Sequence, residues 1–299
     1  MPSEKGPTVT ITDPERRRGF RNTLVASFFL GWAPILGKLA YAHGVTPFTL
    51  AALRTVVSVL LLWIGYSILW QKWLRISWRE LVGCIAIGAV NGLGSLLYYS
   101  GLSRLDASLA SFLNTLYPLW VILFLTASGQ PIHWLTLLRM GMAMGGIYLL
   151  TGSGTGESDW LGVMLMIASA ATYGWHLVLA QWVLADVPSR TVTIYVLTAM
   201  ACTVGIARAL QGAPVEVIPL PGWEAIVALG LTTVLSRVLM FAGLERIGGI
   251  EAALVSLLEL LVSLILAFLL LGERLMPLQW VGGAVLVTGI LLGSLEVKR

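Results

Sequence analysis

Long apolar runs separated by short polar links make up most of this chain. Ten runs can be marked, near residues 22–42, 47–70, 81–102, 107–128, 134–152, 159–183, 191–210, 223–244, 249–271 and 277–295. Most contain ~20 residues, and a helix of that length, at about 1.5 Å per residue, crosses the ~30 Å hydrocarbon core of a bilayer. The links between the runs are rich in Gly, Pro and charged residues. The pattern predicts an all-α polytopic membrane protein with ten transmembrane helices.

The composition supports a membrane protein and excludes several classes of function. The 299 residues are 57% hydrophobic and 11% charged, whereas a soluble domain carries roughly 25% charged residues. The net charge of +4 comes without a stripe rich in Lys and Arg, so no nucleic-acid partner is expected. Cys84 and Cys202 both lie inside apolar runs and indicate neither a disulfide framework nor a metal site. No cofactor is expected.

Weak internal similarity relates the two halves of the chain. Gly31-Trp32 recurs 143 residues later as Gly174-Trp175. A spacing of 142 relates Gly101-Leu102 and Arg104 to Gly243-Leu244 and Arg246. Internal repeats of this kind decide the architecture. The predicted organisation is a polar cytoplasmic tail at 1–20, a first five-helix repeat at 21–153 and a second at 158–295, with a flexible link near 152–159.

Five spans in each half give the second half the opposite polarity in the membrane. Substrate sites of transporters built from such inverted repeats lie at the repeat interface near the bilayer midplane, and alternating access moves the opening from one side to the other. Ten spans also put both termini on one side. Basic residues near the span ends number eleven on that side and four on the other. Both termini are therefore expected in the cytoplasm of a cell whose inner membrane holds the protein.

Polar side chains recur at helical spacing on six of the predicted spans. Because polar groups are costly in hydrocarbon, they should face water or the bundle interior. The stripes are Thr23, Ser27 and Gly31-Trp32; Asn91, Ser95, Tyr98 and Tyr99; Ser108, Ser111, Asn114 and Thr115; Ser169, Thr172, Tyr173 and His176; Thr232, Thr233, Ser236 and Arg237; and Ser256, Glu259 and Ser263. Small residues also let membrane helices pack closely, which competes as an explanation for any single Ser or Thr. Together the stripes predict a wet central cavity enclosed by one chain, and a monomer is expected.

Few ionisable residues lie deep in the predicted spans. Glu259 is the one carboxylate in the middle of a span, where it can bind an ammonium group, relay protons, or pair with Arg237 or Arg54. Arg237 is suited to receive a carboxylate because its guanidinium fork matches that geometry. Arg54 lies nearer a span end, where a long side chain can reach the interface. His176 can titrate near neutrality, although a lone histidine is more often a hydrogen-bonded packing residue.

Aromatic and helix-bending residues complete the candidate site. Most of the twelve tryptophans lie near span ends, as an interfacial belt requires. Deeper aromatic residues can form an apolar, cation-tolerant wall; they are Trp32, Tyr98, Tyr99, Tyr117, Trp120, Trp175 and Trp182. Pro34 and Pro118 lie within spans and each removes a backbone hydrogen bond. With Gly92, they are the candidates for gating bends.

Several motifs resemble those of one transporter superfamily. A Leu-Gly-Glu-Arg link before the last helix of the repeat is matched by Leu271-Gly272-Glu273-Arg274. Further matches are Arg54 in the second span, Pro118 in the fourth, Glu259 in the ninth, and Gly282 with Gly289 in the tenth. The sequence departs from the pattern at Leu260, where a Pro usually follows the Glu, and at Ser128-Gly129-Gln130-Pro131, which lacks the Glu. Over nearly its whole length the chain resembles the drug/metabolite transporter superfamily, EamA type, and it looks most like the YddG-type exporters of aromatic and other amino acids.

The resemblance implies a secondary transporter that exports amino acids, with aromatic and other apolar ones favoured, by alternating access. The expected ammonium acceptors are Asn91, Asn114, Ser256 and Glu259, the expected carboxylate donors are Arg237 and His176, and the apolar wall is Trp32, Tyr99 and Trp175; Ser95, Tyr98, Tyr117 and Ser236 complete the predicted substrate site. Small multidrug-resistance relatives carry a Glu for proton coupling in their first helix, but neither the first nor the sixth span here has a carboxylate. Facilitated diffusion and ion coupling both stay open.

Other functions are less well supported by the residues. A drug, nucleoside or sugar carrier of the same superfamily is the alternative within the class. An integral membrane enzyme would need a catalytic constellation, but the sequence has no His-Glu-x-x-His, no Gly-x-Ser-x-Gly and no paired membrane aspartates, and its three histidines are dispersed. A channel or sensor would not need inverted halves. The expected partners are a small molecule and membrane lipid.

Overall fold

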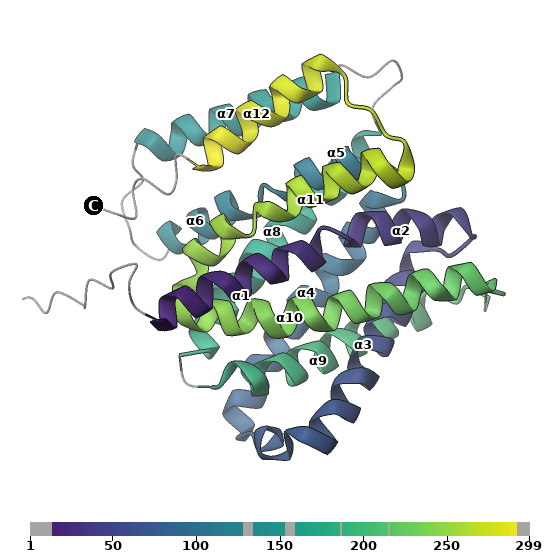
Figure 1. Ribbon diagram of the computed structural model, residues 1–299, viewed down its shortest axis with the longest axis vertical. Coiled ribbons are helices and arrows are strands. Elements are labelled where there is room, and N and C mark those ends of the chain that lie inside the picture. The colour runs from purple at the N-terminus through teal and green to yellow at the C-terminus, as the bar shows by residue number, and fades with distance from the viewer. Residues whose placement is uncertain (1–13, 128–133, 153–158, 186, 215, 292–299) are drawn as a thin grey trace, which may run out of the picture.

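The computed structural model describes residues 14–127, 134–152, 159–185, 187–214 and 216–291, and within these ranges the chain is helical without strands (Figure 1). The helices are α1 (Pro14–Leu30), α2 (Ala33–Ala42), α3 (Pro47–Leu69), η1 (Gln71–Leu74), α4 (Trp78–Leu102), α5 (Ala107–Asn114), α6 (Tyr117–Ala127), α7 (Trp134–Gly152), α8 (Trp160–Val183), α9 (Ser189–Leu210), α10 (Leu220–Val255), α11 (Leu258–Leu266), η2 (Ala267–Leu271) and α12 (Pro277–Leu291). The all-α prediction is confirmed for these residues. The tail before residue 14, the 128–131 link and the 153–158 join lie outside the described residues.

Seven helical segments in the described ranges are long and apolar enough to cross a bilayer. They are Pro14–Ala42, Pro47–Leu69, Trp78–Leu102, Ala107–Ala127, Trp160–Val183, Ser189–Leu210 and Leu220–Val255. The segment Leu258–Leu271 is shorter but also apolar. Ten crossings and an inverted arrangement of the halves stay predictions.

Several helix ends are fixed by residues that the sequence places there. Ser77 and Glu80 form a capping box at the start of α4, with the Ser77 N–H donating to the Glu80 carboxylate at 2.8 Å. Asp159 caps α8 by accepting a hydrogen bond from the Gly162 N–H at 3.0 Å. Such caps satisfy N–H groups that have no partner within the helix.

Three short breaks interrupt the apolar helices in the described part of the chain. The chain turns at residues 31–32 between α1 and α2, at 115–116 between α5 and α6, and at 256–257 between α10 and α11. Pro34 and Pro118 follow the first two breaks and supply no backbone N–H. The third break has Leu260 where a proline would be expected, so its interruption does not depend on that residue type.

Gly92 was a predicted bend, but α4 runs unbroken through it. Instead, Gly92 faces α9, where an added Cβ would lie 2.8 Å from the Thr203 Cβ. Gly88 faces the same helix, and its added Cβ would lie 2.6 Å from the Val196 carbonyl oxygen. These glycines therefore serve close helix packing, the competing explanation for small residues in membrane helices.

The helices pack into one bundle in which α4 and α10 are central. Helix α4 packs against α8 and α9, and α10 packs against α1 and α3. Helices α7 and α12 lie side by side at one edge of the bundle (Figure 1). They cross closely at Gly146 and Gly282, since a Cβ on either glycine would lie within 2.9 Å of the carbonyl oxygen of the other. The polar cavity described below lies next to these two central helices.

Candidate functional site

A cavity of about 100 Å³ lies where α4 and α10 meet the interrupted helices. Its walls come from α1, α2, α3, α4, α5, α8, α10 and α11. The lining residues are Phe29, Leu30, Ala33, Pro34, Arg54, Asn91, Gly94, Ser95, Tyr98, Tyr99, Ser111, Asn114, Ser169, Tyr173, Thr232, Thr233, Ser236, Arg237, Glu259 and Ser263. Six of these helices, α3, α4, α5, α8, α10 and α11, turn polar groups toward this shared interior space, as expected for polar residues in hydrocarbon.

Arg54 is a buried cation in the wall of this cavity, with 6% of its surface exposed. Its guanidinium donates to the Ser95 hydroxyl at 2.6 Å and to the Thr233 hydroxyl at 3.0 Å. It also lies 4.7 Å from the centre of the Tyr99 ring. The Arg54 Nε atom is buried without a hydrogen-bond partner. The expectation that this side chain reaches the membrane interface is wrong, because its hydroxyl partners are on neighbouring helices inside the bundle.

Arg237 is the second buried cation of the cavity, with 7% of its surface exposed. It donates to the Asn91 side-chain oxygen at 3.2 Å and to the Tyr173 hydroxyl at 3.4 Å. Its guanidinium carbon lies 5.2 Å from the centre of the Tyr173 ring. All of these partners are uncharged, as are those of Arg54.

The two guanidinium groups bind side chains at neighbouring positions on α4. Asn91 holds Arg237 and Ser95 holds Arg54, and residues four apart on a helix lie one above the other on one face. No ion pair to either arginine is found within the described residues. Buried charges normally require a partner of opposite sign. The pair is therefore suited to hold an anionic group of a bound molecule.

Glu259 supplies the carboxyl group of the cavity, with 7% of its surface exposed. Its carboxylate accepts a hydrogen bond from the Asn114 side-chain amide at 3.3 Å. The structural pairing with Arg237 or Arg54, one of the three roles left open for Glu259, is not formed: its hydrogen-bond partner is Asn114, and neither arginine forms an ion pair with it. Two cations and one carboxylate leave a formal excess of one positive charge in the lining.

One side of the cavity is apolar. Tyr98 and Tyr99 meet edge to face, with their ring centres 5.1 Å apart. The other apolar lining residues are Phe29, Leu30, Ala33 and Pro34, next to the break between α1 and α2. Their side chains carry no polar signal, so the polar stripes could not identify them. The cavity thus combines charged groups with a surface that favours an apolar substituent.

Of the residues predicted for substrate binding, the structure brings eight to this cavity and leaves five outside its lining. Those in the lining are Asn91, Ser95, Tyr98, Tyr99, Asn114, Ser236, Arg237 and Glu259, together with the predicted gating residue Pro34. Those outside it are Trp32, Tyr117, Trp175, His176 and Ser256, together with Gly92 and Pro118. The sequence stripes also contained Ser111, Ser169, Tyr173, Thr232, Thr233 and Ser263, which line the cavity but were not selected.

His176 lies behind the cavity wall. It is fully buried, stacks on Tyr173 with ring centres 5.6 Å apart, and its Nδ1 atom is 3.5 Å from the Ile87 carbonyl oxygen. Ser169 and Tyr173 of α8 line the cavity, and His176 packs one turn beyond Tyr173. His176 is not placed to receive a substrate carboxylate.

The other predicted residues outside the lining have structural contacts. Trp175 packs against Phe124 and Trp182, with ring centres 5.1 Å and 5.9 Å apart. Tyr117 packs edge to face on Tyr173, and the Ser256 hydroxyl donates to the Ala252 carbonyl at 2.7 Å. Within the described residues, no group of three or more His, Cys, Asp and Glu side chains is arranged to hold a metal ion.

Carboxylates of the second half cap helices of the first half, away from the cavity. Glu273 accepts hydrogen bonds from the backbone N–H groups of Ala107 and Ser108, both at 2.8 Å, at the start of α5. Glu216 accepts from the Thr46 N–H at 3.0 Å and the Thr49 hydroxyl at 2.8 Å, at the start of α3. A carboxylate at a helix N-terminus is favoured by the helix dipole. Both contacts join segments that are distant in sequence.

An ion pair joins the start of α8 to the end of α4. The Arg104 guanidinium lies 2.9 Å from the Asp159 carboxylate. Hydrogen bonding from the Gly162 N–H and from Arg104 lowers the pKa of Asp159 below its ordinary value. This pair lies at the same end of α4 as the start of α5.

Comparison with known proteins places this membrane-embedded bundle and cavity among transporters. The EamA-like transporter family model matches residues 18–152 and again residues 160–295. The chain therefore belongs to the EamA-like transporter family, within the drug/metabolite transporter superfamily. The match to two successive segments covers most of the chain.

Two individual proteins are similar to this chain. The uncharacterized transporter YcbK of Bacillus subtilis (strain 168) is 28% identical over 261 residues, which are 82% of each protein. A solved crystal structure with 20% sequence identity covers 95% of this chain and 99% of its own, with a TM-score of 0.68. At that identity the likeness to the solved structure concerns the fold alone. Transporter function is thus shown at the level of the family.

Proposed function

We propose that this protein is a secondary transporter that exports amino acids, with aromatic and other apolar ones favoured, from the cytoplasm. The observation that carries the proposal is the placement of Arg54, Arg237 and Glu259 in the lining of one cavity. An amino acid has a carboxylate, an ammonium group and a side chain, and each needs a different surface. The cavity offers all three kinds of surface within about 100 Å³.

The carboxylate of the substrate is assigned to the two arginines. Their present hydrogen-bond partners are neutral, and the Nε donor of Arg54 has none. A carboxylate that accepts from both guanidinium groups would supply the missing negative charge, and hydrogen bonds to charged groups contribute about 1.5–3 kcal/mol each. This assignment replaces the pair of Arg237 and His176 expected from the sequence.

The ammonium group is assigned to Glu259 and the Asn114 side chain, which already share a hydrogen bond. The apolar substituent is assigned to the surface formed by Tyr98, Phe29 and Pro34. Tyrosine rings tolerate both aromatic and aliphatic partners, so several apolar amino acids fit this surface equally well. Broad specificity follows from that assignment.

The pattern of helix contacts supports inverted repeats. With a spacing near 142 residues, α1 corresponds to α8, α3 to α9 and α4 to α10. Helix α4 packs on α8 and α9, and α10 packs on α1 and α3, so each contact has a counterpart in the other half. The interruptions at 115–116 and 256–257 are also at related positions. We infer two repeats, at 21–153 and 158–295, that enclose the cavity of a ten-span monomer.

Alternating access is the mechanism that this arrangement supports. The cavity is lined by the broken segments α1–α2, α5–α6 and α10–α11, whose interruptions let the parts on either side of the site move separately. Ten spans and the bias of basic residues support cytoplasmic termini in the inner membrane of a bacterial cell. Facilitated diffusion needs no further residue, whereas ion coupling would act through Glu259.

Flux measurements with three matched compounds test the substrate assignment. Purified protein in liposomes is loaded with labelled phenylalanine, phenylpropionate, which lacks the ammonium group, or phenethylamine, which lacks the carboxylate. Phenylalanine is expected to cross fastest, and a pH gradient will separate uniport from proton coupling. Transport of a nucleoside, a sugar or a cationic drug without any amino-acid flux would reject the assignment and favour another carrier type of the same superfamily.

A further inference from the structure

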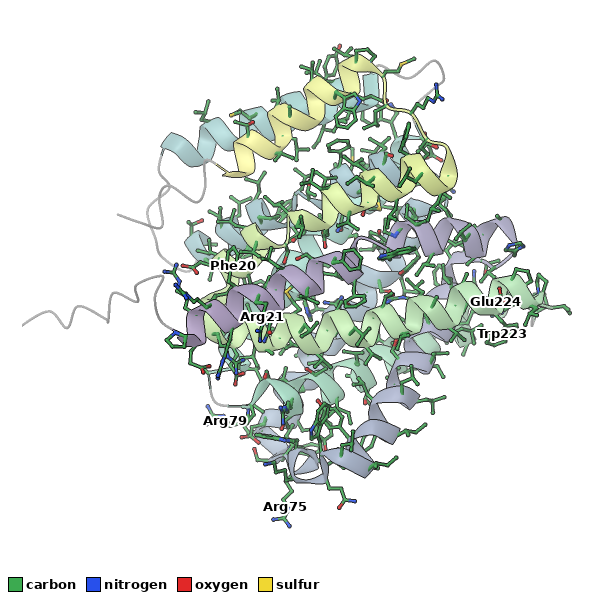
Figure 2. All side chains as sticks on the ribbon, viewed as in Figure 1. Phe20, Arg21, Arg75, Arg79, Trp223 and Glu224 are labelled. Atoms are coloured by element: carbon green, nitrogen blue, oxygen red, sulfur yellow. The ribbon has the colours of Figure 1, made fainter. Side chains whose placement is uncertain are left out.

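A basic, tryptophan-rich corner of the molecule has no role in the cavity. It consists of Trp70, η1 with Lys72 and Trp73, the following Arg75 and Arg79, and Arg190 at the start of α9. Figure 2 shows Arg75 and Arg79 at the edge of the bundle, away from the end marked by Trp223 and Glu224. Lys72, Arg75, Arg79 and Arg190 are all exposed.

Arg190 is held in a fixed position at this corner. Its guanidinium carbon lies 4.9 Å from the centre of the Trp70 ring and 5.4 Å from that of the Trp73 ring. Cation–π contacts of this kind use the faces of the aromatic rings and occupy no hydrogen-bond acceptor. The N–H groups at its edge are left for an acceptor, and their fork geometry suits a phosphate.

The backbone beneath the cations is also fixed. The Thr191 hydroxyl donates to the Trp73 carbonyl at 3.0 Å, and the Tyr195 hydroxyl donates to the Leu74 carbonyl at 2.6 Å. The Tyr66 hydroxyl donates to the Arg190 carbonyl at 2.9 Å. These hydrogen bonds join α3, η1 and α9, so the cations belong to a preformed surface.

Among the described residues, the acidic side chains near this corner, Glu80 and Glu245, are engaged elsewhere. Glu80 accepts the Ser77 N–H in the capping box of α4. Glu245 lies 3.7 Å from Arg246 and accepts the Ser189 N–H at 3.4 Å. No ion pair to the four cations of the corner is found in the described part of the chain. Their positive charge is available to an external anion.

The surface next to the corner is apolar and exposed. Ile64, Ile68 and Leu69 on the last two turns of α3 have 58%, 72% and 70% of their surface exposed. Trp78, at the start of α4, is 76% exposed. The exposed apolar end of α3 is suited to contact the acyl chains of a phospholipid, and the tryptophans and cations beyond it are suited to contact the headgroup.

We propose that Arg190, Lys72, Arg75 and Arg79 form a binding site for the headgroup of an anionic phospholipid whose acyl chains lie along the exposed end of α3. The edge of the Arg190 guanidinium contacts the phosphodiester, and the other three cations add attraction for the net negative charge. A zwitterionic lipid lacks that net charge and binds less tightly. The bound lipid would hold together α3, η1, α4 and α9 at the point where they meet.

Native mass spectrometry and thermal unfolding of the detergent-solubilised protein test this site. Phosphatidylglycerol is compared with phosphatidylcholine of the same acyl chains, and inorganic phosphate is the third addition. We expect more phosphatidylglycerol than phosphatidylcholine to stay bound, and a higher unfolding temperature with phosphatidylglycerol only. Equal effects of the two lipids, or the same stabilisation by inorganic phosphate, would reject a lipid headgroup site.

Variants then locate the site. Arg75→Gln with Arg79→Gln changes only exposed side chains, and Arg190→Gln removes the stacked guanidinium. Each lost cation is expected to weaken phosphatidylglycerol binding about fivefold, in line with the attraction of one basic residue to an anionic membrane. Arg21→Gln removes an exposed cation on α1 (Figure 2) and is the matched control, expected to leave the lipid preference unchanged. A preference that survives in all variants, or one that falls equally with Arg21→Gln, would overturn the proposal.

Discussion

The Ser108 hydroxyl donates a hydrogen bond to the Glu273 carboxylate at 2.6 Å and so joins the start of α5 to the link before α12. The same carboxylate accepts the first two N–H groups of α5. Glu273 belongs to the Leu-Gly-Glu-Arg motif, so the motif here caps a helix that lies 165 residues earlier in the sequence. The link before α12 is thereby attached to the interrupted helix that carries Asn114.

We predict that Glu273→Gln destabilises the protein by about 1–2 kcal/mol, because a capping interaction contributes about 1 kcal/mol and a negative charge at a helix N-terminus about 0.3–1 kcal/mol. The amide has one acceptor oxygen in place of two and no charge. Unfolding by denaturant in micelles measures the change. Ser108→Ala removes one of the three bonds and should cost less; a larger loss with Ser108→Ala would contradict the capping role.

Substitution of the cavity arginines should show whether transport depends on their positive charge or on the shape of the guanidinium group. Arg237→Gln is predicted to raise the half-saturating concentration of phenylalanine in the flux assay about tenfold or more, since one charge-assisted hydrogen bond contributes about 1.5–3 kcal/mol. Arg54→Lys keeps a positive charge but loses the fork that reaches Ser95 and Thr233. We expect it to impair flux of phenylalanine less than Arg54→Gln. Unchanged flux in all three variants would remove the arginines from the substrate site.

Two glycines provide a matched test of helix packing. A Cβ added at Gly88 would lie 2.5 Å from the Ala199 Cβ, whereas a Cβ added at Gly65 would meet nothing within 4 Å. Gly88→Ala is predicted to destabilise the bundle by about 1–3 kcal/mol through overpacking. Gly65→Ala is predicted to be neutral or to stabilise by up to about 1 kcal/mol, because alanine is the better helix former. Thermal unfolding of both variants in one detergent makes the comparison, and equal effects would refute the close contact of α4 with α9.

The ion pair between Asp159 and Arg104 should make stability depend on acidic pH. The folded-state pKa of Asp159 is lowered by the Gly162 N–H and by Arg104. The charged carboxylate therefore contributes stability above its unfolded pKa, about 3.9, and the contribution is lost as pH falls through the lower folded pKa. Asp159→Asn is predicted to lower the unfolding temperature near neutral pH but not at strongly acidic pH. A difference that does not change with pH would contradict the ion pair.

The sequence predicted the helical class and much of the cavity because polar residues in hydrocarbon obey a 3.6-residue period. Asn91, Ser95 and Tyr98 were found in this way, and all line the cavity. The period shows which face of a helix is polar, but it does not show which turns along the helix line the cavity. His176 fits the same stripe as Tyr173, yet it lies one turn too far along α8 and is covered by Tyr173.

The position of Arg54 was beyond this kind of reasoning. Its hydroxyl partners Ser95 and Thr233 are 41 and 179 residues away in the sequence, and their approach depends on how α3, α4 and α10 pack. From the sequence, an arginine near the start of a span is equally compatible with a side chain at the membrane interface and with one buried in the bundle. Only the tertiary contacts distinguish the two positions.

Gly248 has a backbone conformation, φ 78° and ψ 169°, that side-chain-bearing residues rarely adopt. It is a kink within α10, between Arg237 and the break at 256–257 that precedes Glu259 on α11. Any swing of α11 relative to α10 must be absorbed as torsion at Gly248 or at the break at 256–257. A movement of one helix is therefore transmitted to the other, which couples the position of Arg237 to that of Glu259. A bulky residue at position 248 would restrict this movement.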